Sequence, residues 1–342
     1  MATIVESIGT AGDDTTIQGW ENGLPANLVT DGNIYQGECK AEAFSGQTYL
    51  DGHTADATHY YRLTSADGAE HDGRPHAVSA AGNARVSTTG TNVYPMLVSD
   101  EYVRVDWMEF QQSGDARREC IYFLSVAACD IYVHHNIIHG AFASGDASQH
   151  TGIRVNDADA TFKIYRNIIY ARDLDGIWAE AGAAGSAILC NTIYQCNTGS
   201  AASGGINCDD ADFLIENNAC FDNTTKDIAD TTGTLDYNAT HDTTGDDEGE
   251  HGIANLTTAN QFVNPTTTWA ETDLLVKAGA DLIGAGNSGY STATYPEIDV
   301  PISTRGTTIT GAWDIGADQY VGAPPPSGIP AHSDYYFRMR DQ

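Results

Sequence analysis

The amino-acid sequence predicts an all-β solenoid, in which short parallel strands stack into successive coils. The prediction rests on two short sequence motifs, each of which recurs once per repeat in the middle of the chain. The longer one reads IYVHHNIIH at 131–139, IYRNIIY at 164–170, ILCNTIY at 188–194 and FLIENNACF at 213–221. The shorter one reads CIYF from Cys120, GIRV from Gly152, GIWA from Gly176 and GINC from Gly205. Two short apolar segments per repeat are typical of a solenoid, because each buries a face only by stacking on its neighbours.

Each phrase has the alternation of a strand rather than that of a helix. In Ile153-Arg154-Val155 and in Ile177-Trp178-Ala179 the apolar residues can point inward while Arg154 and Trp178 point outward. The segments are rich in Ile, Val and Tyr and are bounded by Gly, Asn, Asp and Ser, as strands are. We expect the two phrases to lie on successive strands of two parallel sheets.

The asparagine of the longer phrase predicts a ladder at one corner of the solenoid. Asn tolerates left-handed backbone angles, and its side chain can hydrogen-bond to the backbone of the next coil. Because strands stack about 4.8 Å apart, equivalent side chains in successive coils would meet. The predicted members are Asn136, Asn167, Asn191 and Asn217.

A short helix is expected near the N-terminus, because Ile17, Trp20 and Leu24 are spaced along one helical face. Asp13 or Asp14 would provide its N-cap. Such a helix would cover the open end of the solenoid, which needs a terminal unit with a polar outer face.

The composition divides the chain into three regions. Residues 1–95 are expected to form the N-terminal cap and the first, irregular coils, and residues 96–320 the regular solenoid. Within the second region, residues 222–260 are rich in Thr, Asp and Gly and are expected to form a long loop. Residues 321–342 are a Pro-rich linker and a tail.

With these phrases the chain resembles the right-handed, single-stranded parallel β-helix (pectate-lyase-like) superfamily, and more narrowly its bacteriophage and environmental members with NNIIY-type repeats. The closing phrase Asp314-Ile-Gly-Ala-Asp-Gln-Tyr320 and the segment from Gln261 to Ile283 resemble the last coils of that family. The resemblance implies the fold over residues 1–320. It implies no single function, since β-helices carry lyases, hydrolases, adhesins and inert virion spikes alike.

The charge and the cysteines exclude several classes of protein. Lys and Arg number 16 against 47 Asp and Glu, a formal net charge of −31, which argues against nucleic-acid binding and against anionic membranes. No apolar run is long enough to insert into a membrane. The seven cysteines have no CxxC spacing and are expected to be free thiols in the core. The N-terminus shows no leader sequence. Free thiols and the lack of a leader together indicate synthesis in a reducing cytoplasm.

Acidic residues follow the shorter phrase at similar positions. Aligning these phrases puts Asn156, Glu180 and Asp209 in one column, with Asp157 and Asp210 beside it. Stacked carboxylates raise one another's pKa, and they would bind Ca²⁺ or act as an acid/base pair. A chain with 47 acidic residues also aligns some by chance. We therefore assign no catalytic residue and no cofactor, and keep Glu180 and Asp209 as candidates beside the alternative of a solvated acidic face.

The outward residues of the same strands indicate carbohydrate binding. Tyr122, Arg154, Trp178 and Asn207 occupy equivalent positions in successive coils. A flat apolar ring beside directional donors is what a sugar-binding face needs. The alternative is that a loop covers Trp178, as happens to most tryptophans.

Four histidines, His134, His135, His139 and His150, are close enough in sequence to suggest a metal site. Strand alternation sends His134 and His135 to opposite faces, and no HExxH or similar ligand pattern is present. We expect surface and corner histidines, and no metal.

The C-terminus is aromatic and basic, unlike the acidic body. After the proline run at 324–326 the tail carries Tyr335, Tyr336, Phe337, Arg338 and Arg340. These residue types anchor interfaces, so the tail is interpreted as a docking peptide for a partner or a second copy. The alternative is a frayed end.

These observations predict a non-catalytic structural protein of a virion surface, such as a head decoration, fibre or tail appendage, with a possible role in adhesion to host glycans. Its partners would be other virion proteins or copies of itself. One alternative is a tailspike-like polysaccharide lyase or hydrolase, which needs a carboxylate or Lys/Arg constellation in a groove; the scarcity of basic residues disfavours the lyase form. The other is a bacterial cell-surface adhesin, which would carry a signal peptide in its full-length gene.

Overall fold

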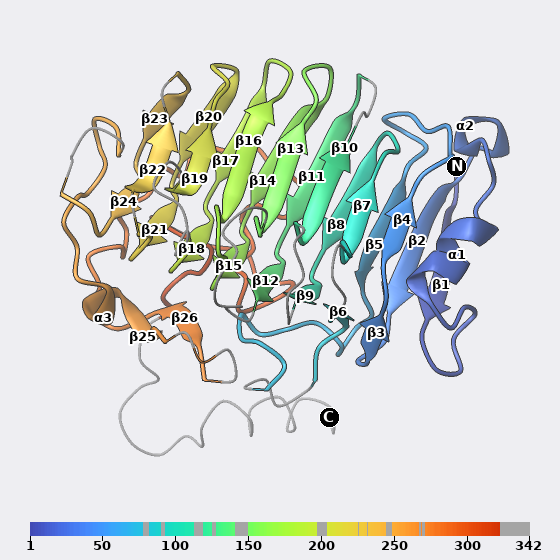
Figure 1. Cartoon of the computed structure of the whole chain (residues 1–342), viewed down its shortest axis with the longest axis horizontal. Helices are drawn as coiled ribbons and strands as arrows, with labels where there is room; N and C mark the ends of the chain where they lie inside the picture. Colours follow the sequence, from blue (N-terminus) through green and yellow to red (C-terminus); the bar gives the residue numbers. More distant parts are fainter. Residues whose placement is uncertain are drawn as a thin grey trace.

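The computed structural model describes residues 1–77, 82–89, 93–112, 119–124, 128–140, 150–196, 204–224, 226–230, 232–243, 248–266, 268 and 271–321. Over this part of the chain it shows a parallel β-helix whose coils stack in sequence order (Figure 1), which confirms the predicted fold class. Each regular coil contributes three strands, so three sheets run along the solenoid rather than the two expected.

The three sheets are named here by their number of strands in the described residues. The nine-stranded sheet contains β1 (Thr3–Ile8), β2 (Ile34–Cys39), β5 (Tyr61–Ser65), β8 (Val103–Asp106), β11 (Asp130–His134), β14 (Thr161–Tyr165), β17 (Ser186–Leu189), β20 (Phe213–Glu216) and β23 (Thr234–Asp236). The eight-stranded sheet contains β3 (Ala43–Ser45), β6 (Arg85–Thr88), β9 (Glu109–Gln112), β12 (Ile137–Gly140), β15 (Ile168–Tyr170), β18 (Thr192–Tyr194), β21 (Ala219–Phe221) and β24 (Ala239–Thr240). The seven-stranded sheet contains β4 (Thr48–Leu50), β7 (Met96–Val98), β10 (Ile121–Leu124), β13 (Ile153–Asn156), β16 (Ile177–Ala181), β19 (Gly204–Cys208) and β22 (Lys226–Asp230).

The core is built from inward side chains that repeat from coil to coil. On the seven-stranded sheet they lie in one column of fully buried isoleucines: Ile121, Ile153, Ile177, Ile206 and Ile228. All seven cysteines are free and buried, as expected. Burying apolar surface contributes about 25 cal/mol per Å², so stacking of these columns is the main stabilisation of the solenoid.

The longer phrase splits into two strands because one residue in each coil turns the chain with a left-handed backbone angle. These corner residues, all with φ between 53° and 58°, are Trp107, His135, Arg166, Cys190, Asn217 and Tyr237. The residues that follow them are Met108, Asn136, Asn167, Asn191, Asn218 and Asn238. The side-chain oxygen of each ladder Asn accepts the backbone N–H of the equivalent residue one coil earlier.

The ladder therefore runs through Asn136, Asn167 and Asn191 to Asn218 and Asn238. The inclusion of Asn217 was wrong by one residue. Asn217 occupies the left-handed corner, and its side chain bonds outward to Asn287. The loop expected over 222–260 instead contains β22, β23 and β24, which form a further coil with Asn238 at its corner.

The N-terminal end of the solenoid is covered by α1 (Ile17–Gly23) and α2 (Leu28–Asp31), which confirms the capping helix. The N-cap of α1 is Thr16 rather than Asp13 or Asp14. The Thr16 hydroxyl accepts a hydrogen bond from the backbone N–H of Gly19 at 2.9 Å. Trp20 of α1 is fully buried. Gly37 makes room for that ring, since a Cβ there would lie 2.8 Å from the indole.

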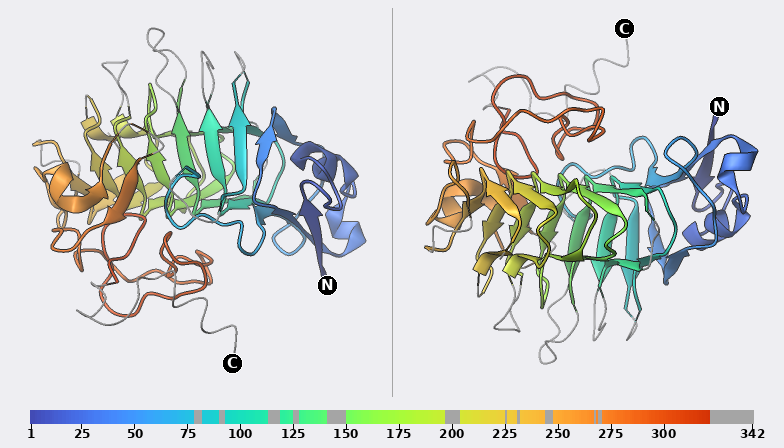
Figure 2. Two further views of the ribbon diagram at one scale, coloured as in Figure 1. Left: turned by 90° about the horizontal axis from the view of Figure 1, so that it is seen from below. Right: turned by 90° about the horizontal axis from the view of Figure 1, so that it is seen from above.

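After the last coil the chain turns back and lies along the outside of the solenoid (Figure 2). This C-terminal cover, residues 258–321, includes α3 (Thr258–Gln261), β25 (Phe262–Asn264) and β26 (Asp273–Val276), the last two pairing antiparallel. It was expected to form last coils and does not. Its apolar residues pack on the outer faces of the eight-stranded and nine-stranded sheets around the asparagine corner.

Candidate functional site

The four residues predicted to bind a glycan lie in one register on the outer face of the seven-stranded sheet. Tyr122 pairs with Arg154, Arg154 with Trp178, and Trp178 with Asn207. All four side chains are half-buried. We call them the outer column. Alternation on strands β10, β13, β16 and β19 places them outward, because their neighbours on both sides belong to the buried core.

The planar groups of the outer column stack on one another. The guanidinium of Arg154 lies 5.1 Å from the ring centroid of Tyr122 and 4.3 Å from that of Trp178, both cation–π distances. Tyr94 extends the stack beyond Tyr122, with ring centroids 5.6 Å apart. The result is a continuous stack along the helix axis that presents the edges of its planar groups outward.

Two carboxylates hold Arg154 in this position. Its Nη1 donates to Glu119 Oε1 at 2.7 Å, and its Nε donates to Glu180. Partial burial disfavours the charged guanidinium, but the hydrogen bonds and charges of Glu180 and Glu119 outweigh this and raise the pKa of Arg154. Glu119, which is buried and which the sequence analysis did not single out, is therefore part of the site.

The predicted column of Asn156, Glu180 and Asp209 is interrupted between its first two members. A bulge between Val155 and Asn156 pairs Asn156 with Ala181, so Glu180 falls out of register. Glu180 bonds to Arg154, while Asp209 accepts from the indole N–H of Trp178 at 3.3 Å. Each candidate carboxylate is thus engaged with the outer column rather than with the other carboxylate.

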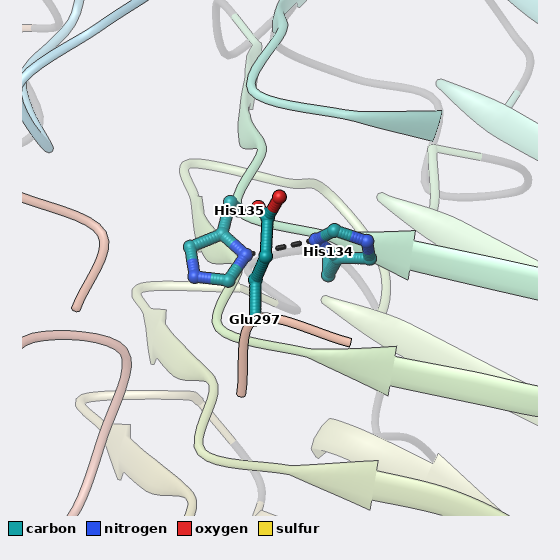
Figure 3. A group of neighbouring side chains, drawn as sticks. All are labelled: His134, His135 and Glu297. Atoms are coloured by element: carbon teal, nitrogen blue, oxygen red, sulfur yellow. Dashed lines mark hydrogen bonds between the residues drawn. The ribbon is translucent and has the colours of Figure 1, made fainter. Parts of the chain in front are cut away.

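The four histidines, which were predicted to lie at the surface and at corners, are all buried. His139 contacts Glu109 at 2.8 Å and His150 contacts Asp173 at 2.6 Å, each through one ring nitrogen. His134 and His135 do not point to opposite faces, because His135 stands in the left-handed corner, where alternation ends. Their Nδ1 atoms lie 2.8 Å apart (Figure 3).

Glu297 of the C-terminal cover lies next to His134 and His135. Ligand atoms of His134, His135 and Glu297 lie within 4.8 Å of one another. Nothing in the sequence links Glu297 to the histidines, which precede it by more than 160 residues. The tail residues Tyr335, Tyr336, Phe337, Arg338 and Arg340 lie outside the described residues.

The strand pairings define this chain as a parallel β-helix protein. No protein-family model matches the chain, and no curated protein matches it. Among solved structures, the crystal structure of pectate lyase Pel9A is similar, with 11% sequence identity, a TM-score of 0.34, and coverage of 93% of this chain and 96% of that chain. A likeness of this size carries no functional argument. In the described part of the chain, no helix is both long and apolar enough to span a bilayer.

Proposed function

We propose that this β-helix binds a neutral polysaccharide along its outer column without cleaving it. The observation that carries the proposal is the register of Tyr122, Arg154, Trp178 and Asn207 on adjacent strands. Strands in a sheet lie about 4.8 Å apart, which is close to the length of one sugar ring in an extended chain. A polysaccharide lying along the helix axis would therefore meet one side chain per sugar.

The chemistry of these side chains suits sugars. Because the rings stack along the axis, they offer their half-buried apolar edges to the C–H groups of a pyranose, and rigid rings lose little entropy on binding. Asn207 offers an amide that both donates and accepts hydrogen bonds to hydroxyl groups. Because Arg154 and Asp209 already fix the orientation of Trp178, the surface is formed before the ligand arrives.

The charge of the face favours a neutral ligand over an acidic one. Glu119, Glu180 and Asp209 lie against the outer column, and the chain as a whole carries a formal charge of −31. A polymer of uronic acids would be repelled by this field. The only cation of the outer column, Arg154, is paired with two carboxylates.

The same contacts argue against cleavage. A lyase needs a base that takes a proton next to a carboxylate, and the bound, charged Arg154 has no basic lone pair to offer. A hydrolase needs two carboxyl groups facing one bond, whereas Glu180 and Asp209 are held by Arg154 and Trp178.

The setting that we propose, a structural role on a virion surface with glycan adhesion, rests on the resemblance of the repeats to bacteriophage β-helix proteins. Capsid, portal or tail genes beside the gene for this chain would support it. A full-length gene with a signal peptide and cell-wall anchor would favour the bacterial adhesin instead.

Binding is tested by isothermal calorimetry with neutral and uronic-acid polysaccharides. We expect binding of a neutral polymer, at least tenfold weaker binding in Trp178→Ala, and no binding of polyuronates. Tyr60→Ala is the matched control, because Tyr60 also stacks under an arginine, Arg104 of the nine-stranded sheet, at 3.8 Å from the ring centroid. Neutral-polymer binding that survives Trp178→Ala would contradict the site.

Cleavage is tested by reducing-end release and by the ultraviolet absorbance of unsaturated products. We expect neither. Product formation that is lost in Glu180→Gln or Asp209→Asn would replace the binding proposal with the lyase or hydrolase alternative.

A further inference from the structure

We propose that His134, His135 and Glu297 form a binding site for a divalent transition-metal ion that fastens the C-terminal cover to the asparagine corner. The site is independent of the outer column, since it lies on another side of the solenoid. His134 ends β11, His135 is the left-handed corner, and Glu297 approaches from the cover (Figure 3).

The hydrogen bonds fix which nitrogens can face an ion. His135 Nε2 lies 2.7 Å from the carbonyl oxygen of Val300, which only accepts, so Nε2 carries the proton. With the proton on Nε2, Nδ1 of the neutral ring carries a lone pair, which points at His134 Nδ1 at 2.8 Å. A metal-binding histidine typically donates its other ring N–H to a carbonyl in this way.

His134 is less well satisfied without an ion. Its Nδ1 must donate to His135 Nδ1 at 2.8 Å, which leaves Nε2 bare and facing Asp106 Oδ2 at 3.8 Å. The neutral ring carries this one proton, on Nδ1. With a cation between the two Nδ1 atoms, that proton moves to Nε2 and faces the carboxylate. When an ion is bound, His134 Nδ1 binds the ion and the protonated Nε2 faces Asp106, so both ring nitrogens have a partner. The ring keeps its one proton.

Both rings are clamped in place. Trp107 stacks on His135 with centroids 4.5 Å apart, and Tyr165 stacks on His134 at 4.6 Å. Glu297 is oriented by Trp107, whose indole N–H donates to it at 2.9 Å. Glu297 is also the accessible member, since its side chain is 35% exposed while the histidines are at most 2% exposed. An ion would therefore enter from the side of the C-terminal cover.

The donor set selects the class of ion. Two imidazole nitrogens and one carboxylate suit transition metals, whereas Ca²⁺ and Mg²⁺ need mainly oxygen ligands. With metal–nitrogen bonds of about 2.0–2.1 Å, nitrogens 2.8 Å apart subtend an angle near a right angle. That angle fits neighbouring positions of an octahedral or square-planar ion such as Co²⁺, Ni²⁺ or Cu²⁺ better than tetrahedral Zn²⁺.

A second group of similar composition, Glu21, His53 and Asp100, lacks this property. His53 contacts Pro25 O through Nδ1 at 3.0 Å and Glu21 through Nε2 at 3.1 Å. Since both ring nitrogens face acceptors, neither offers a lone pair to an ion. His53 and Glu21 therefore form an ion pair. A metal site needs ring nitrogens with an available lone pair as well as the right residue types.

The test is titration of the chain, without an affinity tag, with Co²⁺ followed by visible absorption. A parallel titration with Ni²⁺ follows the quenching of Trp107, which lies against the site. We expect one equivalent to bind and to raise the melting temperature, with no effect of Ca²⁺ or Mg²⁺. Glu297→Gln and His135→Asn should each weaken binding at least tenfold. Asn is chosen because it tolerates the left-handed corner, and Glu297→Gln decides the matter if His135→Asn does not fold.

The control variant is His251→Gln, which removes an exposed histidine paired with Asp236. It should bind Co²⁺ as the wild type does. Three outcomes would overturn the proposal: no binding of Co²⁺ or Ni²⁺ to the wild type, undiminished binding by Glu297→Gln, or loss of binding in His251→Gln.

Discussion

The side-chain oxygen of Asn167 accepts two hydrogen bonds from Asn136, from the backbone N–H at 3.0 Å and from the side-chain amide at 3.1 Å. Asn167 in turn donates its own amide to Val133 O at 2.9 Å and to Asn191 Oδ1 at 3.0 Å. Each interior member of the ladder thus ties three coils together. All of these atoms are buried, so the coils depend on one another for hydrogen-bond partners.

Replacing Asn167 by Leu should therefore lower the free energy of unfolding by about 3 kcal/mol or more. The change removes the acceptor of the Asn136 backbone N–H and the amide that donates to Val133 O, and each unsatisfied buried group costs about 1–3 kcal/mol. Urea denaturation followed by circular dichroism measures the loss. Asn156→Leu is the control, since Asn156 is exposed and should change stability by less than about 0.5 kcal/mol. Equal losses in the two variants would show that the ladder is not the source of stability.

The ladder was predictable because its members recur with the coil, and the misplacement of one member at Asn217 has a local cause. The phrase at 213–221 contains two adjacent asparagines, Asn217 and Asn218. Alternation does not distinguish them, but the following residues do: Asn218-Ala-Cys-Phe matches Asn191-Thr-Ile-Tyr in polarity and length. Asn217 takes the left-handed position, which Asn also tolerates.

The histidine site could not be predicted for two physical reasons. Strand alternation ends with β11 at His134, and at His135 a φ of 54° changes the direction of the side chain. The third member, Glu297, comes from a segment that was expected to continue the coils but instead lies outside them. The outer column was predictable, because in-register pairing follows directly from the repeat.

The stability of the N-terminal end should depend on pH through His53. Its hydrogen bond to Glu21 is the main cause that raises the pKa of His53 above its usual value, and the hydrogen bond to Pro25 adds to it. A raised histidine pKa contributes stability that is fully present below the unfolded pKa of about 6.5 and is lost as pH rises through the folded pKa. The difference in melting temperature between the wild type and His53→Gln should therefore be larger at pH 6 than at pH 9. A difference that grows toward pH 9 would contradict the charged pair.

Deleting residues 324–342 tests the docking interpretation of the tail. The deletion removes Tyr335, Tyr336, Phe337, Arg338 and Arg340, which are the residue types that anchor interfaces. We expect the thermal unfolding of the coils to be nearly unchanged and self-assembly or particle attachment to be lost, as measured by sedimentation. If the shortened chain assembles normally, the tail has no docking role.

Arg166 should control how firmly the C-terminal cover is held. Its guanidinium is fully buried at the corner, with Nε donating to Ile298 O at 3.0 Å and Nη1 to Gly316 O at 3.1 Å. It also lies 4.9 Å from the ring centroid of Trp313. Lysine keeps the charge but lacks the planar fork that reaches several carbonyls. In Arg166→Lys the cover should open locally, and limited proteolysis should cleave between 282 and 321 faster than in the wild type.

The coils should remain folded in Arg166→Lys, because the asparagine ladder and the isoleucine column do not involve the cover. Arg104→Lys is the matched control: Arg104 stacks on Tyr60 and Tyr132, which belong to the coils, and its replacement should leave the cleavage rate within the cover unchanged. If Arg166→Lys instead lowers the melting temperature of the whole chain without earlier cleavage, the cover and the coils unfold as one cooperative unit. The cover would then be a part of the solenoid's stability rather than a segment attached to it.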